Sequence, residues 1–297
     1  MTDFASSRDT AMDSWLQRVL GGAPHTLAPA SGDASFRRYL RLTPAAGPTL
    51  VVMDSPPEHY ALAPFLDIAD RLERAGVRVP AVLAADPELG FALLEDFGSA
   101  HYLDRLREGD AERLYAAALD TLLRIQQDVD ARDLPAYDEA LLRRELALFP
   151  EWLLERHLGL DPGPAGRRAL DAVAAVLVGS ALEQPVVPVH RDYHARNLMV
   201  LEGDVSAVGP GVLDFQDAVV GPLTYDPVSL LRDCYIAWPP ARVEHWIGEV
   251  FRRQRAAGLL PPEVPWETYR RWLGRMGVQR HLKAAGIFAR LHHRDGR

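Results

Sequence analysis

The sequence predicts an α/β fold of the α+β kind with two lobes: a small β-sheet lobe over residues 1–97 and a larger, mainly helical lobe over residues 98–297. Short apolar segments of strand length separated by turn residues fill the first part. Apolar residues at helical spacing dominate the second. The length of 297 residues and the hydrophobic fraction of 48% suffice for a substantial core.

In the first lobe, residues 11–20 place Trp15, Leu16 and Val19 on one helical face, and two glycines end this helix. A second helix follows from Phe65 to about Ala75. The predicted strands lie near residues 26–27, 36–42, 50–54, 81–84 and 91–94. Five strands and few helices indicate a small sheet. The acidic segment at residues 95–96 marks the change to the helical pattern.

In the second lobe, helical periodicity covers residues 111–127, 139–157 and 167–182 and returns several times after Asp226. Asp226 itself precedes a helical pattern, where an aspartate acts as a helix N-cap. Residues 186–189 and 198–201 are short apolar segments that predict strands on either side of a polar loop. The loop between these strands carries the chemistry.

That loop contains His190, Asp192 and Asn197, and Asp214 follows the next apolar pair. Kinases use an aspartate to accept the proton of the attacking hydroxyl, and an asparagine five residues later with a further aspartate to hold magnesium. We therefore predict Asp192 as the catalytic base, and Asn197 and Asp214 as Mg²⁺ ligands. His190 is expected to brace the loop. The spacing is typical of a bilobal protein-kinase-like fold with ATP as phosphoryl donor.

Substrate-binding candidates lie in the loop and after Asp226. His194 and Arg196 belong to the loop, and Arg232 and Tyr235 follow in a segment with cationic and aromatic side chains. This segment lacks the clustered carboxylates that a polycationic substrate would require. The basic stretch at residues 280–290 is a further candidate for the pocket.

The sequence departs from the kinase pattern at the cation that pairs with the ATP phosphates. Its one lysine is Lys283, and Met53 stands where the third strand of a kinase carries lysine. Arg37, Arg38 and Arg41 are the possible replacements, and the alternation of a strand puts Arg38 on the opposite face from the other two. We include Arg38 among the ATP-binding residues without excluding Arg37 or Arg41. The segment G-D-A-S-F-R-R-Y keeps one glycine, Gly32, of the three in the glycine-rich hairpin of kinases. Its residues Ser35 and Phe36 are further ATP-binding candidates, although an ordinary β-hairpin explains this segment equally well.

With these motifs, the chain resembles the aminoglycoside phosphotransferase and choline kinase family over nearly its whole length. The carriers are the H-x-D-x-x-x-x-N loop and L-D-F-Q-D, together with V-M-D-S-P-P-E and L-L-E-D-F-G. The last two resemble the bacterial anomeric sugar kinases within this family. The resemblance implies ATP-dependent phosphorylation of the C1 hydroxyl of N-acetylmuramate or N-acetylglucosamine in cell-wall recycling. It also implies an adenine contact at Glu95 to Phe97.

Two alternatives stay open at this point. One is a kinase for another small hydroxyl compound, such as an aminoglycoside, choline or homoserine. The other is a non-catalytic nucleotide-binding module, suggested by the absent strand lysine. The family usually continues beyond R-D-G, so the sequence, which stops at R-D-G-R, is expected to be shortened.

Composition restricts the partners. A net charge of −8 disfavours a nucleic-acid backbone, and no apolar run approaches the ~18 residues of a membrane span. The single cysteine, Cys234, excludes an internal disulfide and is compatible with a reducing compartment. The N-terminal residues show no signal peptide. We therefore expect a cytoplasmic enzyme acting on a small-molecule sugar, with no nucleic acid, membrane or protein partner inferred.

Overall fold

A computed structural model describes residues 2–30, 37–201, 203 and 209–295. The chain forms two compact units. Unit 1 comprises Met1–Asp70 and Val79–Gly98, and unit 2 comprises Arg71–Arg78 and Ser99–Arg297. The division predicted after residue 97 falls beside this boundary, whereas Arg71–Arg78 groups with unit 2. Helix α2 (Ala63–Arg74) is therefore shared by both units.

Unit 1 contains a five-stranded antiparallel sheet in the order β1-β2-β3-β5-β4. The strands are β1 (His25–Pro29), β2 (Arg38–Pro44), β3 (Leu50–Asp54), β4 (Val82–Asp86) and β5 (Phe91–Glu95). Each lies within about two residues of a strand expected from the sequence. A small sheet in unit 1 and a mainly helical unit 2 confirm the predicted fold class.

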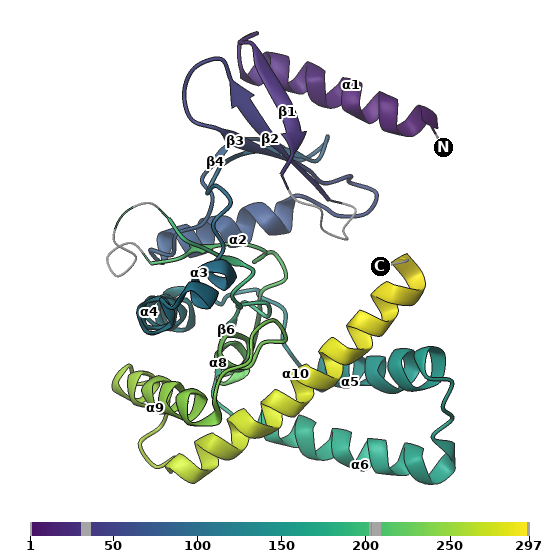
Figure 1. Cartoon of the computed structure of the whole chain (residues 1–297), viewed down its shortest axis with the longest axis vertical. Helices are drawn as coiled ribbons and strands as arrows, with labels where there is room; N and C mark the ends of the chain where they lie inside the picture. Colours follow the sequence, from purple (N-terminus) through teal and green to yellow (C-terminus); the bar gives the residue numbers. More distant parts are fainter. Residues whose placement is uncertain (1, 31–36, 202, 204–208, 296–297) are drawn as a thin grey trace. The chain divides into compact units, whose positions relative to one another are not determined.

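Helix α1 (Thr2–Val19) lies across one face of this sheet (Figure 1). Met12, Trp15 and Leu16 pack with the buried strand residues Leu42 and Phe91. The helix begins nine residues before the predicted start at residue 11, because its first half is polar and lacks the apolar periodicity that marks a buried face. It ends where two glycines adopt positive φ angles of 60° and 76°.

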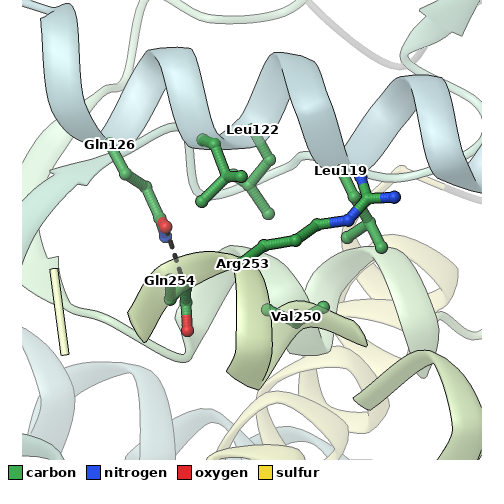
Figure 2. A pocket seen from close by; sticks show the side chains of 7 residues that line it. Leu119, Leu122, Gln126, Val250, Arg253 and Gln254 are labelled. Atoms are coloured by element: carbon green, nitrogen blue, oxygen red, sulfur yellow. Dashed lines mark hydrogen bonds between the residues drawn. The ribbon is translucent and has the colours of Figure 1, made fainter. Parts of the chain in front are cut away.

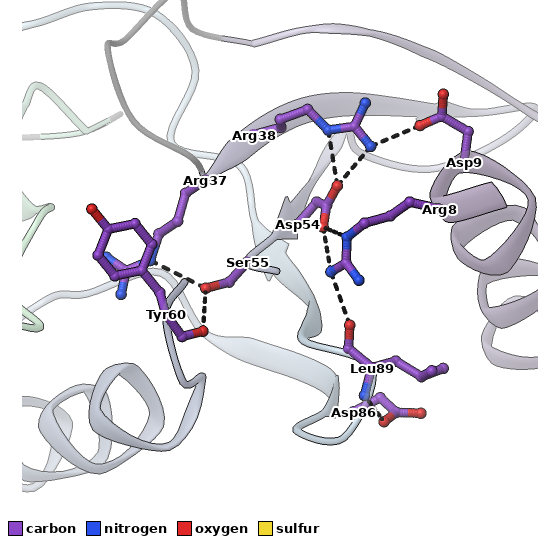
Figure 3. A network of polar contacts seen from close by, with 9 residues as sticks. All are labelled: Arg8, Asp9, Arg37, Arg38, Asp54, Ser55, Tyr60, Asp86 and Leu89. Carbon is purple, nitrogen blue, oxygen red and sulfur yellow. Dashed lines mark hydrogen bonds and ion pairs between the residues drawn. The ribbon is translucent and has the colours of Figure 1, made fainter. Parts of the chain in front are cut away.

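A buried carboxylate joins α1 to the sheet (Figure 3). Asp54 at the end of β3 is fully buried and accepts hydrogen bonds from Arg8 Nε at 2.7 Å and from Arg38 Nε at 2.8 Å. Arg38 also pairs with Asp9 of α1 at 2.7 Å. These charges fix α1 against β2 and β3, since a buried carboxylate requires paired cations.

Unit 2 is mainly helical. Its helices are α3 (Tyr102–Glu108), α4 (Ala111–Asp128), α5 (Glu139–Leu148), η1 (Phe149–His157), α6 (Gly163–Leu182), α8 (Tyr225–Leu231), α9 (Pro240–Ala256) and α10 (Trp266–Asp295). The helix predicted over residues 139–157 is α5 followed by the π-helix η1. Pro150 lies at this junction and lacks the N–H group that a continuing α-helix needs, which accounts for the change in helix type.

Helix α10 packs against α5, η1, α6 and α8, and Figure 1 shows it crossing α5 and α6. Gly286 makes the close approach possible. A Cβ atom at this position would lie 2.4 Å from the carbonyl carbon of Leu148, so no larger residue fits without moving a helix. This packing brings α10 side chains to the polar loop of unit 2.

Two short antiparallel pairs frame that loop: β6 (Val186–Val189) with β9 (Val219–Pro222), and β7 (Leu198–Met199) with β8 (Gly211–Val212). The strand expected over residues 198–201 is two residues long. Among the helices of the described residues, none combines the length and apolar character needed to span a membrane.

Candidate active site

The predicted catalytic loop joins β6 to β7 and is closed by hydrogen bonds within itself. The main-chain oxygen of Asp192 accepts from the N–H of His194 and from Nδ2 of Asn197, each at 3.0 Å. The N–H of Asn197 donates to the carbonyl of His194 at 2.8 Å. Residues 192–197 therefore form a compact turn, with the side chain of Asn197 folded back toward Asp192.

Asp192 and His190 lie at the start of this turn. His190 is buried, and its Nδ1 accepts a hydrogen bond from the N–H of Asp192 at 3.3 Å. The Asp192 side chain is half-buried. Burial alone would raise the pKa of this carboxyl, but the charges of Lys283 and Arg280 lower it below its usual value. The bracing role of His190 stays a prediction. It is supported by the burial of His190 and by its hydrogen bond with the Asp192 N–H.

Asn197 and Asp214 come together at the other end of the loop. Asn197 Nδ2 lies 3.4 Å from Asp214 Oδ2, and the main-chain oxygen of Asn197 accepts from the N–H of Leu213 at 2.9 Å. Gln216 Nε2 donates to Asp214 Oδ1 at 2.8 Å. Asp214 has a positive φ of 61°, which is unusual for a residue other than glycine. A carboxylate beside an amide is a donor set that fits a hard divalent cation.

The role predicted for Asp226 was wrong. Thr224 occupies the N-cap position of α8, and Asp226 lies inside the first turn with its side chain buried. Its two oxygens accept from the N–H of His190 at 2.7 Å and from the N–H of Arg191 at 3.0 Å. Asp226 thus fixes the main chain at the start of the predicted catalytic loop. Burial raises the pKa of Asp226, because it outweighs these favourable contacts. The local sequence pattern contained no signal for this contact.

The predicted substrate residues divide into two groups. His194 and Tyr235 have ring centroids 5.2 Å apart, and the Arg196 guanidinium lies 5.0 Å from the Tyr235 ring centroid. Burial lowers the pKa of His194 to about 4, so its imidazole is neutral near pH 7. Arg232 lies against α10, where its Nη1 would be 3.3 Å from a Cβ at Gly277. Three of the four candidates therefore form one cluster beside Asp192.

The predicted nucleotide residues belong to unit 1. Ser35 and Phe36 lie outside the described residues. Glu95 is bonded through its N–H to the carbonyl of Ala81 at 2.9 Å, and Phe97 follows two residues later. The ATP-binding assignments, including that of Arg38, stay predictions.

The three candidate arginines have different surroundings. The strand register places Arg38 opposite Asp54, on the face that α1 covers, and Met53 on the other face opposite Tyr39. Arg41 donates to both oxygens of Asp96 and to the carbonyl of Gly98. The Arg37 Nε donates to Ser55 Oγ at 3.3 Å. Arg38 would have to leave two carboxylates to reach a phosphate.

A pocket elsewhere in unit 2 does not match the predicted site. It lies between α4 and α9 and has no room for a water molecule, and Figure 2 shows the lining residues. Gln254 Nε2 donates to Gln126 Oε1 at 2.9 Å, and the Tyr269 hydroxyl donates to Gln254 Oε1 at 2.7 Å. A space that cannot admit a water molecule cannot hold a ligand. These buried amides therefore serve helix packing.

The chain matches the family model described as "Phosphotransferase enzyme family" over residues 26–272. The chain belongs to this family. The match includes the catalytic loop and Asp214, and it confirms the prediction of a phosphotransferase. The resemblance to the aminoglycoside phosphotransferase and choline kinase family is confirmed as well.

Relatives of this phosphotransferase have more specific names. An N-acetylmuramate/N-acetylglucosamine kinase of Pseudomonas aeruginosa is 50% identical over 275 residues, covering 92% of this chain and 79% of that protein. The enzyme of the same name from Pseudomonas putida is 48% identical over 272 residues, covering 92% and 78%. Both names agree with the function predicted from the sequence.

Solved structures show the fold of this phosphotransferase. The streptomycin–ATP ternary complex of APH(2")-IIa superposes with a TM-score of 0.61 at 14% sequence identity, covering 93% of this chain and 89% of that one. This similarity confirms the predicted kinase-like fold. At 14% identity this similarity shows the fold and not the substrate.

Proposed function

We propose that this phosphotransferase is an ATP-dependent kinase that phosphorylates the anomeric C1 hydroxyl of N-acetylmuramate and N-acetylglucosamine. Relatives at 48% and 50% identity carry the name of that kinase. The observation that carries the chemistry is the convergence of Asp192, Asn197 and Asp214 on one loop and the turn after β8.

Asp192 is the proposed base. The oxygen of the C1 hydroxyl attacks the γ-phosphorus, the bond between this phosphorus and the β–γ bridging oxygen breaks, and ADP leaves. The hydroxyl proton passes to the Asp192 carboxylate. This reaction demands chiefly orientation of the hydroxyl and compensation of phosphate charge, so a carboxylate fixed by its loop is sufficient.

Asn197 and Asp214 are the proposed ligands of Mg²⁺. When bound, this ion would neutralise charge on the β- and γ-phosphates. The amide nitrogen of Asn197 donates to Asp192, so its amide oxygen is the atom left for a cation. Two oxygen ligands are enough, because Mg²⁺ keeps several waters and binds phosphate oxygens.

The adenine is proposed to bind the main chain between Glu95 and Phe97, and the phosphates to contact Ser35 and Phe36, which lie outside the described residues. Of the three arginines, Arg37 and Arg41 lie on the same strand face as Met53 by the alternation of β2 and β3, and Arg41 is bound to Asp96. The Arg37 Nε donates to the Ser55 hydroxyl, and the Arg37 guanidinium lies 4.8 Å from the Tyr60 ring centroid. Arg38 remains a predicted contact that requires release from Asp54.

Sugar recognition is assigned to His194, Arg196, Arg232 and Tyr235. A neutral imidazole at His194 can donate one hydrogen bond to a sugar oxygen. Arginine is the residue suited to the lactyl carboxylate of N-acetylmuramate, because its planar fork matches two carboxylate oxygens. We place the reaction in the cytoplasm, which agrees with ATP as donor and with a single cysteine.

The test is ADP release from Mg-ATP with each sugar, measured together with loss of the sugar's reducing end. Release coupled to this loss supports phosphorylation at C1. Release with the reducing end intact would move the acceptor to another hydroxyl and contradict the proposal. The variant Asp192→Asn is expected to lose turnover and to bind ATP normally. Asp171→Asn, at an exposed position on α6, serves as the matched control.

A further inference from the structure

Arg191, immediately before Asp192, has an unusual main-chain conformation. Its φ is 77°, in the left-handed region that side chains other than glycine rarely adopt. Such a conformation costs free energy and persists only where the surroundings impose it. The direction of the Asp192 side chain depends on this φ, since Arg191 sets the path of the chain into the loop.

Three charged side chains from three different helices hold Arg191. Its N–H donates to Asp226 of α8 at 3.0 Å, and its carbonyl oxygen accepts from Arg280 Nη1 of α10 at 2.7 Å. Its guanidinium pairs with Glu145 of α5 at 2.7 Å. The main-chain donor, the main-chain acceptor and the side chain are therefore all fixed by ions.

Glu145 is shared between Arg191 and the one lysine of the chain. Lys283 Nζ lies 3.0 Å from Glu145 Oε1 and donates to the Tyr225 hydroxyl at 3.0 Å. The side chains of Glu145 and Lys283 are 7% and 10% exposed. Tyr137 also donates its hydroxyl to Glu145. A buried carboxylate with two cations and a hydroxyl is fully paired and keeps a defined position.

Arg280 contacts the loop main chain and Tyr225. The basic stretch at residues 280–290 was a candidate part of the sugar pocket. Within this stretch, Arg280 donates from Nη1 to the carbonyl oxygen of Arg191, and its guanidinium lies 4.8 Å from the Tyr225 ring centroid. Lys283 is buried and bonded to Glu145 and Tyr225. Arg280 thus contacts the loop directly, and Lys283 contacts it through Glu145, the partner of Arg191.

We propose that Arg280, together with the Glu145–Lys283 pair, is a set of positioning residues that holds Arg191 in its left-handed conformation and so aims Asp192 at the acceptor hydroxyl. This inference rests on the proposed function of Asp192 as base. It gives the chain's one lysine a role in unit 2, in a chain whose third strand carries Met53 instead of lysine.

The expected signature is a loss of kcat with little change in KM, because none of these side chains is assigned to either substrate. A misplaced base slows the chemical step strongly, and we expect Arg280→Met to lower kcat about tenfold or more. KM for ATP and for the sugar should stay within about threefold. Arg280→Lys retains one N–H donor for the Arg191 carbonyl and should recover most of the lost kcat.

A second variant tests the inference independently in case Arg280→Met does not fold. Glu145→Gln with Lys283→Met removes the two charges of the buried Glu145–Lys283 pair together. Arg191 loses its carboxylate in this variant, but its guanidinium is 19% exposed and keeps its contact with the Asp217 carbonyl. The variant should reproduce the kcat loss of Arg280→Met. The matched control is Arg271→Met, which removes a half-exposed α10 arginine lying 3.9 Å from Glu183 and should leave kcat unchanged.

Amide hydrogen exchange of residues 189–193 provides a readout that does not require turnover. Arg280→Met should exchange in this segment about tenfold faster than the wild type, and Arg271→Met at the wild-type rate. Folded Arg280→Met protein with wild-type exchange and kcat would overturn the inference. So would equal losses of kcat in Arg280→Met and Arg280→Lys. If the wild type shows no sugar-dependent ADP release, the proposed function fails, while the exchange experiment still tests the contacts on Arg191.

Discussion

Asp54→Asn is expected to lower the local stability of the unit 1 sheet, because this carboxylate is the shared partner of two arginines. The substitution keeps the shape of the side chain and removes its charge. Asp54 accepts from Arg8 Nε at 2.7 Å and from Arg38 Nε and Nη2 at 2.8 and 2.6 Å. An asparagine can accept from one arginine only, and its NH₂ group then faces the other.

The magnitude follows from burial. Asp54 is fully buried, while Arg8 and Arg38 are 21% and 42% exposed, so water compensates part of the loss on the arginine side. Losing one charge-assisted pair and leaving an unmatched donor at a buried position should cost about 3 kcal/mol. That free energy corresponds to a roughly 150-fold larger equilibrium population of the opened sheet, and so to roughly 150-fold faster amide exchange.

Native-state hydrogen exchange of the β3 amides over residues 50–54 measures this effect in the intact chain. Asp9→Asn is the matched control, because Asp9 is half-exposed and pairs with the same Arg38, and its loss should cost below about 1 kcal/mol. If Asp54→Asn and Asp9→Asn accelerate exchange equally, burial of the Asp54 charge does not stabilise the sheet and the reasoning is wrong.

Three further outcomes are expected. Asp214→Ala should raise the Mg²⁺ concentration for half-maximal activity about tenfold or more, and an unchanged metal titration would remove its proposed role. Gly286→Ala should destabilise unit 2 by about 2 kcal/mol or more, since its Cβ would lie 2.4 Å from Leu148, whereas Gly274→Ala, with open space around it, should be neutral or stabilising in thermal unfolding. Asp226→Ala should lower kcat about tenfold, because the N–H groups of His190 and Arg191 lose their acceptor; a folded variant with wild-type kcat would contradict that assignment.

Much of the fold was accessible from local patterns. A short apolar run bounded by polar and turn residues predicted β3 over Leu50–Asp54 without error, and glycines after α1 predicted its end. These signals are local, since a short apolar run and helix termination depend on neighbouring residues. The start of α1 was missed because its first half carries no apolar periodicity. The π-helical turn after α5 was missed because a proline signals disruption without specifying its form.

The sequence by itself determined the reaction class. Asp192, Asn197 and Asp214 occur at a spacing that phosphoryl transfer requires. Asp192 and Asn197 are close because they share one loop, whereas Asp214 comes beside them through the pairing of β7 with β8. The strand alternation likewise determined that Arg38 and Arg37 point to opposite faces of the sheet.

Only the tertiary structure decided what holds those groups in place. Glu145, Asp226 and Arg280 lie 46, 35 and 89 residues from Arg191 in the chain, and each contacts it. No periodicity encodes such contacts, because they arise where α5, α8 and α10 pack together. The close approach at Gly286 and the burial of Lys283 belong to the same packing. The chemistry is therefore local in sequence, whereas its orientation is a property of the assembled helices.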